Sequence, residues 1–407
     1  MLKKENLKEH RFFFYFLILM LSLTLLWLDK PLGSLIFDEA YYVNAARVIA
    51  GVTPPKESQY SNSPLGKDPN IEHPFLGKVI ISLFIKSFGD NAFSWRIPSV
   101  IFSLIALIFF YFLAFRLFKS SRMALYSSII LGLDNLFFVH SRIATLDIFM
   151  LSFIIMGFYF FLSRKYIPSG IALALAFLFK EQSILAIFVV IIYIGFNYLF
   201  SKEFESLKAL WLFLVGLALG YFPLAYFLTP IFTNFQNPLE HVEYMYNYVG
   251  ALVRQGSPVG IESYPWQWIL NQVEIPYLKV DGEVFAGEKS LGKVTLIYFN
   301  GAMNPSIIYL TPIALSYTLL EFIKGKRDSH LFLLLWFFVT YLPYFPLALL
   351  ANRIMYLFYF LNTLPSLALA LGLTFLDERI PKSISLAYLF SVALGFLALF
   401  PFKSIPS

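Results

Sequence analysis

The sequence contains no cysteine among its 407 residues. This absence excludes a disulfide framework, thiolate metal sites and a cysteine nucleophile. Charged residues are also scarce, since they make up 14% of the chain whereas about 25% is usual in a soluble domain. Hydrophobic residues make up 58%, and a surplus of this size needs lipid as its solvent. The composition therefore excludes an ordinary soluble domain and predicts a membrane protein.

Motifs for several soluble chemistries are missing as well. No Gly-rich phosphate loop stands at a strand–helix junction, so nucleotide binding of the Walker or Rossmann type has no support. The net charge of +6 comes from basic residues dispersed over short loops, without the basic stripe of a nucleic-acid surface. No second histidine stands at metal-ligand spacing from His73. We therefore expect no nucleic-acid partner and neither a nucleotide nor a metal ion as cofactor.

Long apolar stretches recur along the whole chain. Most have about 17–25 residues, which is enough to cross a hydrocarbon core of about 30 Å. They predict an all-α polytopic membrane protein with about eleven transmembrane helices in a single domain. The predicted domain is 1–407 and its spans are residues 12–28, 94–115, 123–140, 146–163, 169–180, 183–200, 209–228, 296–323, 330–349, 354–375 and 383–401.

The first apolar run, 12–28, follows a basic segment that contains Lys8 and Arg11. A secretory signal peptide begins in the same way. The run is long for such a peptide, however, and residues 29–31 (Asp-Lys-Pro) are no small-residue cleavage site. We interpret the run as a retained signal anchor.

Basic residues near the ends of the spans predict the orientation, because cytoplasmic loops retain Lys and Arg. With the N-terminus inside, every predicted inside loop is basic. Examples are Arg116, Lys119, Arg122, Arg164, Lys165, Lys324, Arg379 and Lys382. We therefore predict a multi-pass protein of the plasma membrane with a cytoplasmic N-terminus.

Two long polar segments, 29–93 and 229–295, then fall on the outer face. The first holds two amphipathic runs, 40–50 and 75–88, that suit helices lying in the membrane interface. The second holds the aromatic sequence 264–268, which is typical of an interfacial belt; a sugar- or peptide-binding surface is the alternative. We expect chemistry or recognition in these two outer segments.

Two adjacent carboxylates, Asp38 and Glu39, stand near the start of the first outer segment. Ionisable groups near the membrane are costly to desolvate and are functional candidates for that reason. Acids at a helix N-terminus are also favoured by the helix dipole, so that both residues could be helix caps instead. The two residues alone leave both interpretations open.

A second candidate lies at residues 72–78, Glu-His-Pro-Phe-Leu-Gly-Lys. Pro74 opens an apolar helix and Lys78 follows one turn later, so this helix start offers free backbone N–H groups and a cation to an anion. A lone histidine at such a start is more often a hydrogen-bonded structural residue than a ligand. We therefore take Lys78 as an anion-binding candidate, with Glu72 and His73 as supporting residues.

Polar residues interrupt the apolar pattern between the third and fourth predicted spans, at 134–147. We predict a helical hairpin that turns at the outer membrane face. Arg142 needs an anionic partner there. This partner is either Asp134 or Asp147, in a structural pair, or a ligand phosphate, which the planar guanidinium group matches well.

Two further cations, Lys180 and Arg353, reach the same outer level between predicted spans. Both are candidates for binding a phosphate. The alternative is that both side chains simply extend to the lipid headgroups.

Taken in order, these motifs resemble the dolichyl-phosphate-mannose–protein mannosyltransferase family, within the GT-C class of polytopic glycosyltransferases. The resemblance runs from about residue 12 to about residue 375. Phe75 departs from the His-Pro-Pro-Leu-Gly-Lys signature, and the 229–295 segment is too short for the extra outer β-rich domain of eukaryotic members, which favours the prokaryotic branch. The segments that carry the resemblance are the acidic pair Asp38-Glu39 with Tyr41-Tyr42, which is similar to the catalytic motif, then 73–78, 95–99, 141–147, Asn304-Pro305 and Arg353.

The resemblance implies transfer of a sugar, mannose in this family, from a polyprenyl (dolichyl) phosphate to a hydroxyl, such as Ser or Thr of an exported protein. Asp38 would accept the hydroxyl proton in an inverting displacement. Arg142, helped by Lys78, Lys180 or Arg353, would stabilise the departing phosphate. This scheme requires neither a nucleotide nor a metal.

Other functions remain open at this point. GT-C enzymes also move other sugars onto lipids or glycans, so that fold likeness does not fix the substrate. A transporter or lipid flippase is the alternative from another class, although transporters often show internal repeats and midplane sites. No repeat is found here, and the polar motifs cluster at one face. The donor sugar, the acceptor, the length of the lipid carrier and a dimeric state are not determined by the sequence.

Overall fold

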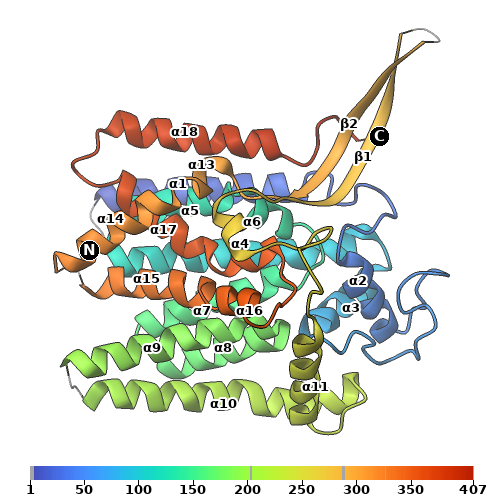
Figure 1. The fold of residues 1–407 in the computed structure, drawn as a ribbon, viewed down its shortest axis with the longest axis horizontal. Helices are drawn as coiled ribbons and strands as arrows, with labels where there is room; N and C mark the ends of the chain where they lie inside the picture. Colours follow the sequence, from blue (N-terminus) through green and yellow to red (C-terminus); the bar gives the residue numbers. More distant parts are fainter. Residues whose placement is uncertain (1–3, 202–203, 287–288, 326, 407) are drawn as a thin grey trace.

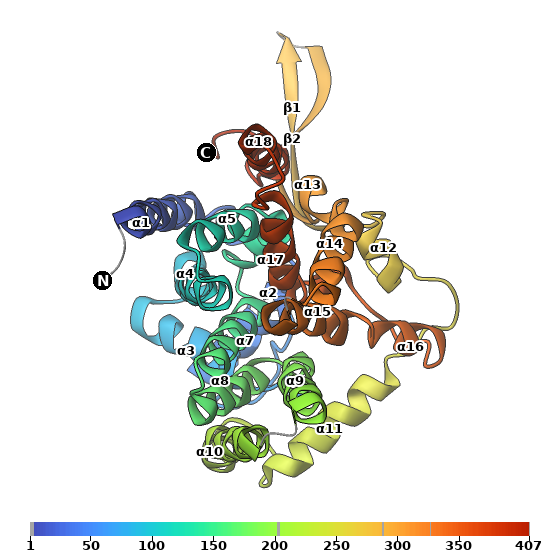
Figure 2. The same cartoon turned by 90° about the vertical axis from the view of Figure 1, so that its left-hand side faces the viewer.

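Most long helices of the protein lie roughly along one axis, which is horizontal in Figure 1 and seen end-on in Figure 2. The computed structural model describes residues 4–201, 204–286, 289–325 and 327–406. The helices of the bundle are α1 (Lys4–Leu25), α4 (Ala92–Phe118), α5 (Ser121–Gly132), α7 (Asp147–Leu162), α8 (Tyr166–Phe179), α9 (Ile184–Ser201), α10 (Phe204–Phe232), α14 (Thr311–Ile323), α15 (Arg327–Tyr341), α17 (Leu364–Phe375) and α18 (Lys382–Leu399). The other elements are α2 (Glu39–Ala50), α3 (Leu76–Phe88), α6 (Asn135–His140), η1 (Glu181–Ser183), α11 (Pro238–Ala251), α12 (Pro265–Ile269), β1 (Ile275–Ala286), β2 (Lys289–Gly301), α13 (Pro305–Ile308), α16 (Tyr344–Leu349) and η2 (Leu357–Asn362).

Six helical segments are long and apolar enough to cross a membrane, counted over the described residues. Three shorter apolar helices, α7, α8 and α17, lie among them. The predicted polytopic, mainly helical fold is confirmed. The six segments are Ala92–Phe118, Glu181–Phe200, Glu205–Phe232, Pro305–Ile323, Asp328–Leu349 and Lys382–Leu399.

Glycines allow α8 and α10 to pack closely. A Cβ atom added to Gly170 would collide with the backbone of α10, and one added to Gly216 would collide with the backbone at Ile167. Apolar helices in lipid associate mainly through such close contacts, because lipid tails are as apolar as the helix surfaces. The contact fixes the position of α8, which ends at Phe179 and has Lys180 as its C-cap.

The prediction of a span over 296–323 was wrong in its first part. Residues 289–301 form strand β2, which pairs with β1 in an antiparallel hairpin that projects beyond the bundle (Figure 1). Val, Thr, Ile, Tyr and Phe in this segment favour a strand, although their apolar character resembles that of a membrane helix. The segment after α18 joins the hairpin, since the Tyr298 N–H donates to the Pro401 carbonyl at 2.7 Å.

Three other predicted spans are interrupted. Between α5 and α6, Asp134 accepts hydrogen bonds from the N–H groups of Leu136 and Phe137 and so starts a new helix. Pro343, which has no N–H to donate, separates α15 from α16. The predicted span 354–375 begins with extended backbone and η2, so that α17 starts only at residue 364.

The two ends of the bundle differ. Helices α2, α3 and α11 and the hairpin gather at one end, whereas the start of α1 and the connection from α17 to α18 lie at the other (Figure 1). The described parts of 29–93 and 229–295 therefore lie at the same end. Both predicted amphipathic runs are helices, but most side chains of α2 are buried within the protein, whereas α3 exposes Leu83 and Phe88.

Candidate active site

Asp38 directly precedes α2, at the end of the bundle that carries the two long segments (Figure 1). It occupies the N-cap position, yet its side chain accepts no hydrogen bond from the first turn of the helix. Among the described residues, no other hydrogen bond to this carboxylate is found. Helix capping therefore does not account for Asp38.

The residue before Asp38 adopts a strained conformation. Phe37 has a φ of 55°, in the left-handed region, which costs about 1–2 kcal/mol for a residue with a side chain. Its ring stacks on Tyr277 at 4.1 Å and meets Phe358 edge-on at 5.7 Å. These aromatic contacts stabilise the turn that leads into Asp38.

The surroundings of Asp38 change its acidity. Burial raises the pKa of its carboxyl group from 3.8 to about 6, the charge of Lys180 opposes this rise, and Asp147 adds to it. The charge of His73 lowers the pKa by a smaller amount. A general base is most effective when its pKa lies near the working pH. With this pKa, the Asp38 carboxylate accepts a proton readily.

Lys180 and Asp147 form a buried ion pair next to this carboxylate. Nζ of Lys180 lies 2.7 Å from Oδ1 of Asp147, and the two side chains are 3% and 2% exposed. The second oxygen, Oδ2, lies 3.8 Å from Nδ1 of His140. Nε2 of His140 is 2.9 Å from the Tyr277 hydroxyl. One polar chain thus connects the cation to the tyrosine that stacks on Phe37.

Glu39 has a different environment from its neighbour. Its two oxygens accept hydrogen bonds from Nε and Nη2 of Arg96, both at 2.8 Å. They also accept the N–H groups of Ile36 at 2.8 Å and Ala144 at 2.9 Å. Glu39 is fully buried, and breaking a buried pair of this kind costs about 3–5 kcal/mol. The carboxylate joins α2 to α4 and to the segment before α7.

Protein groups occupy the predicted anion site at the start of α3. Nζ of Lys78 lies 2.6 Å from Oδ2 of Asp68, and both side chains are fully buried. The same ammonium group donates to the His73 carbonyl at 3.1 Å and to both oxygens of Asn70. Glu72 accepts a hydrogen bond from the Asn70 amide. Lys78 and Glu72 therefore belong to one internal network in the first long segment.

His73 is paired, as expected for a structural histidine at a helix start. Its Nδ1 lies 3.0 Å from Oε2 of Glu181, and the two side chains are 22% and 20% exposed. Its ring also meets the ring of Tyr42 edge-on at 5.9 Å. This pair connects the start of α3 to η1, and it lies close enough to Asp38 to act on its charge.

Of the partners left open for Arg142, neither Asp134 nor Asp147 forms an ion pair with it among the described residues. Its guanidinium group donates instead to carbonyl groups at the end of α1, Leu23 at 3.2 Å, Leu26 at 2.6 Å and Trp27 at 3.2 Å. The side chain is 1% exposed. A cation is favoured at a helix C-terminus by the helix dipole, and Arg142 serves α1 in this way.

Asp134 and Arg353 occupy opposite kinds of environment. Asp134 is fully buried, and its Oδ2 accepts the Asn304 N–H at 2.9 Å in addition to the cap bonds in α6. Arg353 is only partly buried, and one of its nitrogens, Nη1, donates to the Val249 carbonyl. Asp134 therefore joins α6 to the segment before α13, whereas only one nitrogen of the Arg353 guanidinium group is found to donate a hydrogen bond among the described residues.

Four residues of this cluster were not among the predicted site residues. Arg96 and His140 stand inside motifs that the sequence singled out, and Glu181 directly follows Lys180. These positions in the sequence could have marked all three residues. No pattern in the sequence marks Tyr277, which lies in strand β1, within the predicted outer segment 229–295.

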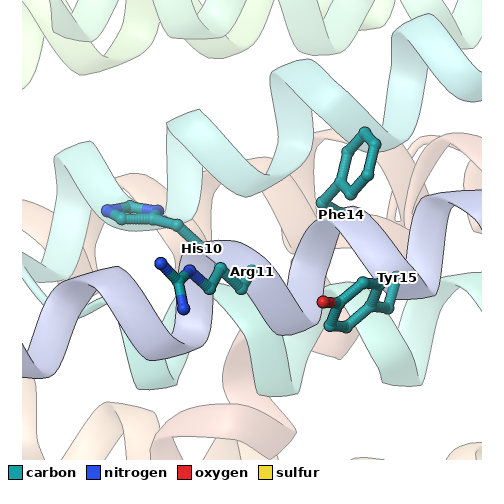
Figure 3. Close-up of a pocket in the computed structure, with 4 residues that line it drawn as sticks. All are labelled: His10, Arg11, Phe14 and Tyr15. Atoms are coloured by element: carbon teal, nitrogen blue, oxygen red, sulfur yellow. The ribbon is translucent and has the colours of Figure 1, made fainter.

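A surface pocket of about 380 Å³ lies elsewhere, on the N-terminal half of α1 (Figure 3). Its lining residues are His10, Arg11, Phe14 and Tyr15, so it offers no carboxylate base. Nδ1 of His10 contacts the Tyr111 hydroxyl at 2.7 Å. Within the described part of the chain, no three His, Asp or Glu side chains are grouped as metal ligands.

The helical bundle has counterparts among solved structures. ArnT from Cupriavidus metallidurans bound to undecaprenyl phosphate aligns with a TM-score of 0.61 and 13% identity, over 96% of this chain and 70% of that one. The S. cerevisiae protein O-mannosyltransferase Pmt1–Pmt2 complex bound to the sugar donor aligns with a TM-score of 0.71 and 13% identity, over 98% and 90%. The Archaeoglobus fulgidus oligosaccharyltransferase aligns with a TM-score of 0.60 and 13% identity, over 97% and 56%. The chain has the GT-C fold of membrane glycosyltransferases.

A family model gives a narrower result. Residues 72–227 match the model described as dolichyl-phosphate-mannose-protein mannosyltransferase. The resemblance that the sequence motifs predicted is confirmed over this segment, which includes His73, Arg142 and Lys180 but begins after Asp38. No curated protein matches the chain.

Proposed function

We propose that the protein transfers mannose from a polyprenyl phosphate to the hydroxyl group of a Ser or Thr residue in an exported protein. The observation that carries this proposal is the state of Asp38, a desolvated carboxylate that accepts no hydrogen bond from the described residues and whose pKa of about 6 suits proton transfer. Two of the similar structures contain polyprenyl phosphate or the sugar donor, which supports a lipid-linked donor here.

The reaction follows from the chemistry of the groups. The acceptor oxygen forms a bond to the anomeric carbon of the sugar while the bond from that carbon to the phosphate oxygen breaks. Asp38 accepts the proton of the acceptor hydroxyl, and the phosphate leaves with the electron pair. The attack comes from the face opposite the phosphate, so that the configuration at the anomeric carbon is inverted.

The donor phosphate is assigned to Arg353 and Lys180. Arg353 is partly buried, and within the described residues only its Nη1 atom is found to donate a hydrogen bond. The charge of Lys180 acts on Asp38. Cations aimed at a leaving phosphate stabilise the negative charge that grows on it. Arg142 donates to three backbone carbonyls and Lys78 donates to protein oxygens, so both side chains support the fold around this site.

The supporting residues keep the base in position. Glu39 fixes the start of α2 through Arg96, and Asp147 orients Lys180. His73 and Glu72 stabilise the start of α3. With the N-terminus in the cytoplasm of a plasma-membrane protein, Asp38 and both long segments face outward, where exported acceptors are available.

The test is transfer of radiolabelled mannose from polyprenyl phosphate mannose to a Ser-containing peptide in membranes that contain the protein. Labelled peptide is expected with the wild type and not with Asp38→Asn. Label recovered in lipid or glycan instead of peptide would show that another acceptor is used. Movement of the lipid across vesicle membranes without any sugar transfer would replace the proposal by a flippase.

A further inference from the structure

A second outer pocket has no role in the reaction described above. It lies between residues 253–259, Glu262 and Ile354 and has a volume of about 490 Å³, within the range of about 300–1,000 Å³ that is typical of ligand pockets. Its walls are two paired segments, because the Arg254 N–H donates to the Asn352 carbonyl at 2.7 Å. The Ser263 N–H similarly donates to the Met355 carbonyl at 2.9 Å. The pocket is therefore built on hydrogen-bonded backbone.

Arg254, in the wall of this pocket, has an incomplete set of partners. Its Nε and Nη1 atoms are buried and have no hydrogen-bond partner among the described residues. Nη2 makes one long contact of 3.4 Å with the Ala348 carbonyl. The guanidinium group packs 4.1 Å from the centre of the Tyr264 ring, which in turn stacks on Trp266 at 4.3 Å. An unpaired buried donor of a charged group is costly, so the arrangement lacks an acceptor that a ligand would supply.

An anionic oxygen is the acceptor that fits best. Arginine presents five N–H donors and binds carboxylates tightly. Within the described residues, no acidic side chain forms an ion pair with Arg254, although Glu262 lines the same pocket. Glu262 accepts the Val259 N–H at 3.3 Å instead. The apolar side chains of Val253 and Val259, which are 49% and 75% exposed, offer surface to the apolar part of a ligand.

The pocket is connected to the candidate base through aromatic residues. The wall segment that ends at Met355 leads directly into Tyr356, whose ring stacks on Phe358 at 5.3 Å. Phe358 meets Phe37, the neighbour of the base, and its ring lies 4.9 Å from Nζ of Lys180. Burial raises the pKa of Tyr356, and the charges of both Glu262 and Asp38 add to this rise.

We propose that this pocket binds an acidic side chain of the polypeptide acceptor at Arg254 and so selects hydroxyl groups that lie near an Asp or Glu residue. The proposal rests on the function proposed above, since it takes Asp38 as the base that receives the acceptor. The pocket and Asp38 then contact the same segment of the acceptor.

The experiment compares two acceptor peptides that differ only in Asp or Asn beside the accepting Ser. The wild type is expected to show a KM about tenfold lower for the Asp peptide, which corresponds to about 1.4 kcal/mol. Arg254→Gln should remove this preference, while the kcat, the KM for the donor and the KM for the Asn peptide stay near the wild-type values. Arg254→Lys should restore part of the preference. Lys279→Gln, which removes a cation on β1 that is 51% exposed, serves as the matched control and should change nothing.

Binding of the labelled Asp peptide to the wild type without donor is measured in parallel by fluorescence anisotropy. This arm does not depend on turnover, so peptide binding without sugar transfer would refute the proposed function and leave the pocket assignment standing. Equal affinity of the wild type for both peptides would overturn the pocket assignment. This measurement uses the wild type alone, so it does not depend on whether a variant folds. A higher KM for the donor in Arg254→Gln would also overturn it, because the pocket would then hold a lipid phosphate.

Discussion

Replacement of Asp38 by Asn tests the proposed base with little other disturbance. The substitution keeps the shape of the side chain and removes its ability to accept the hydroxyl proton. Because no hydrogen bond to Asp38 is found among the described residues, no internal partner is lost. General base catalysis contributes about 10²–10⁴-fold, or roughly 3–5 kcal/mol of barrier. We expect turnover to fall by this factor, while the KM for the donor stays close to the wild-type value.

The same substitution should leave the protein as stable as before or more stable. The pKa of Asp38 rises from 3.8 to about 6 on folding because the carboxylate is desolvated. This group therefore favours the folded state below about pH 4, and the contribution is lost as the pH rises through 6. A shift of about two units corresponds to about 3 kcal/mol at neutral pH, an upper bound because the side chain is only partly buried. Asp38→Asn removes this cost.

The assay combines sugar transfer with thermal unfolding in detergent, from pH 5 to pH 8. The wild type should lose kcat/KM as the pH falls below about 6, because Asp38 becomes protonated there. Asp90→Asn is the matched control, since Asp90 accepts hydrogen bonds from Arg47 at 3.0 Å and from Trp95 at 2.7 Å. This control should lower the unfolding temperature and leave turnover unchanged. Near-normal turnover in Asp38→Asn, or a loss that only follows unfolding, would refute the assignment.

Three further predictions follow from the same site. Glu39→Gln should destabilise the protein by about 3–5 kcal/mol, because it breaks a buried ion pair, and the unfolding temperature at fixed pH measures this; equal stability would contradict the structural role. Arg353→Lys should raise the KM for the donor about tenfold, since an ammonium group cannot make the same planar contacts with a phosphate, and initial rates at varied donor concentration decide it; an unchanged KM would assign the phosphate elsewhere. Cysteine introduced at Glu57 should react with an impermeant maleimide in intact cells and cysteine at Lys165 should not, and the reverse pattern would invert the proposed topology.

The long helices could be predicted from the sequence because apolar length is itself the signal. The predicted span 94–115 corresponds to α4, and 183–200 corresponds to α9. The hairpin could not be predicted in this way. Residues 296–301 are apolar enough to resemble the start of a span, and the strand structure of 289–301 depends on pairing with β1 and with the chain after α18. Hydropathy does not record such long-range partners.

The candidate site, like the fold, could be predicted from the sequence only in part. The sequence indicated which charged residues are costly to bury, and Asp38 and Lys180 do lie close together. It could not indicate which partner satisfies each charge. Arg142 was assigned a carboxylate or phosphate partner, yet its acceptors are backbone carbonyls of α1, more than a hundred positions earlier in the chain. Every residue has a carbonyl group, so no residue type marks such a partner.

Charged side chains in this protein differ in how many of their hydrogen-bonding atoms have a partner. This difference separates the residues that support the fold from those proposed to act on substrates. Glu39 accepts four hydrogen bonds, and the ammonium group of Lys78 has an acceptor for each of its three donors. Such groups offset their desolvation inside the protein. Asp38 accepts no hydrogen bond from any described residue, and Arg254 keeps two nitrogens without a partner there. A hydroxyl group and a carboxylate from outside the chain would complete both. The charges of Asp38 and of Glu262, which lines the Arg254 pocket, both act on Tyr356, and this supports the proposal that a single acceptor segment supplies them together.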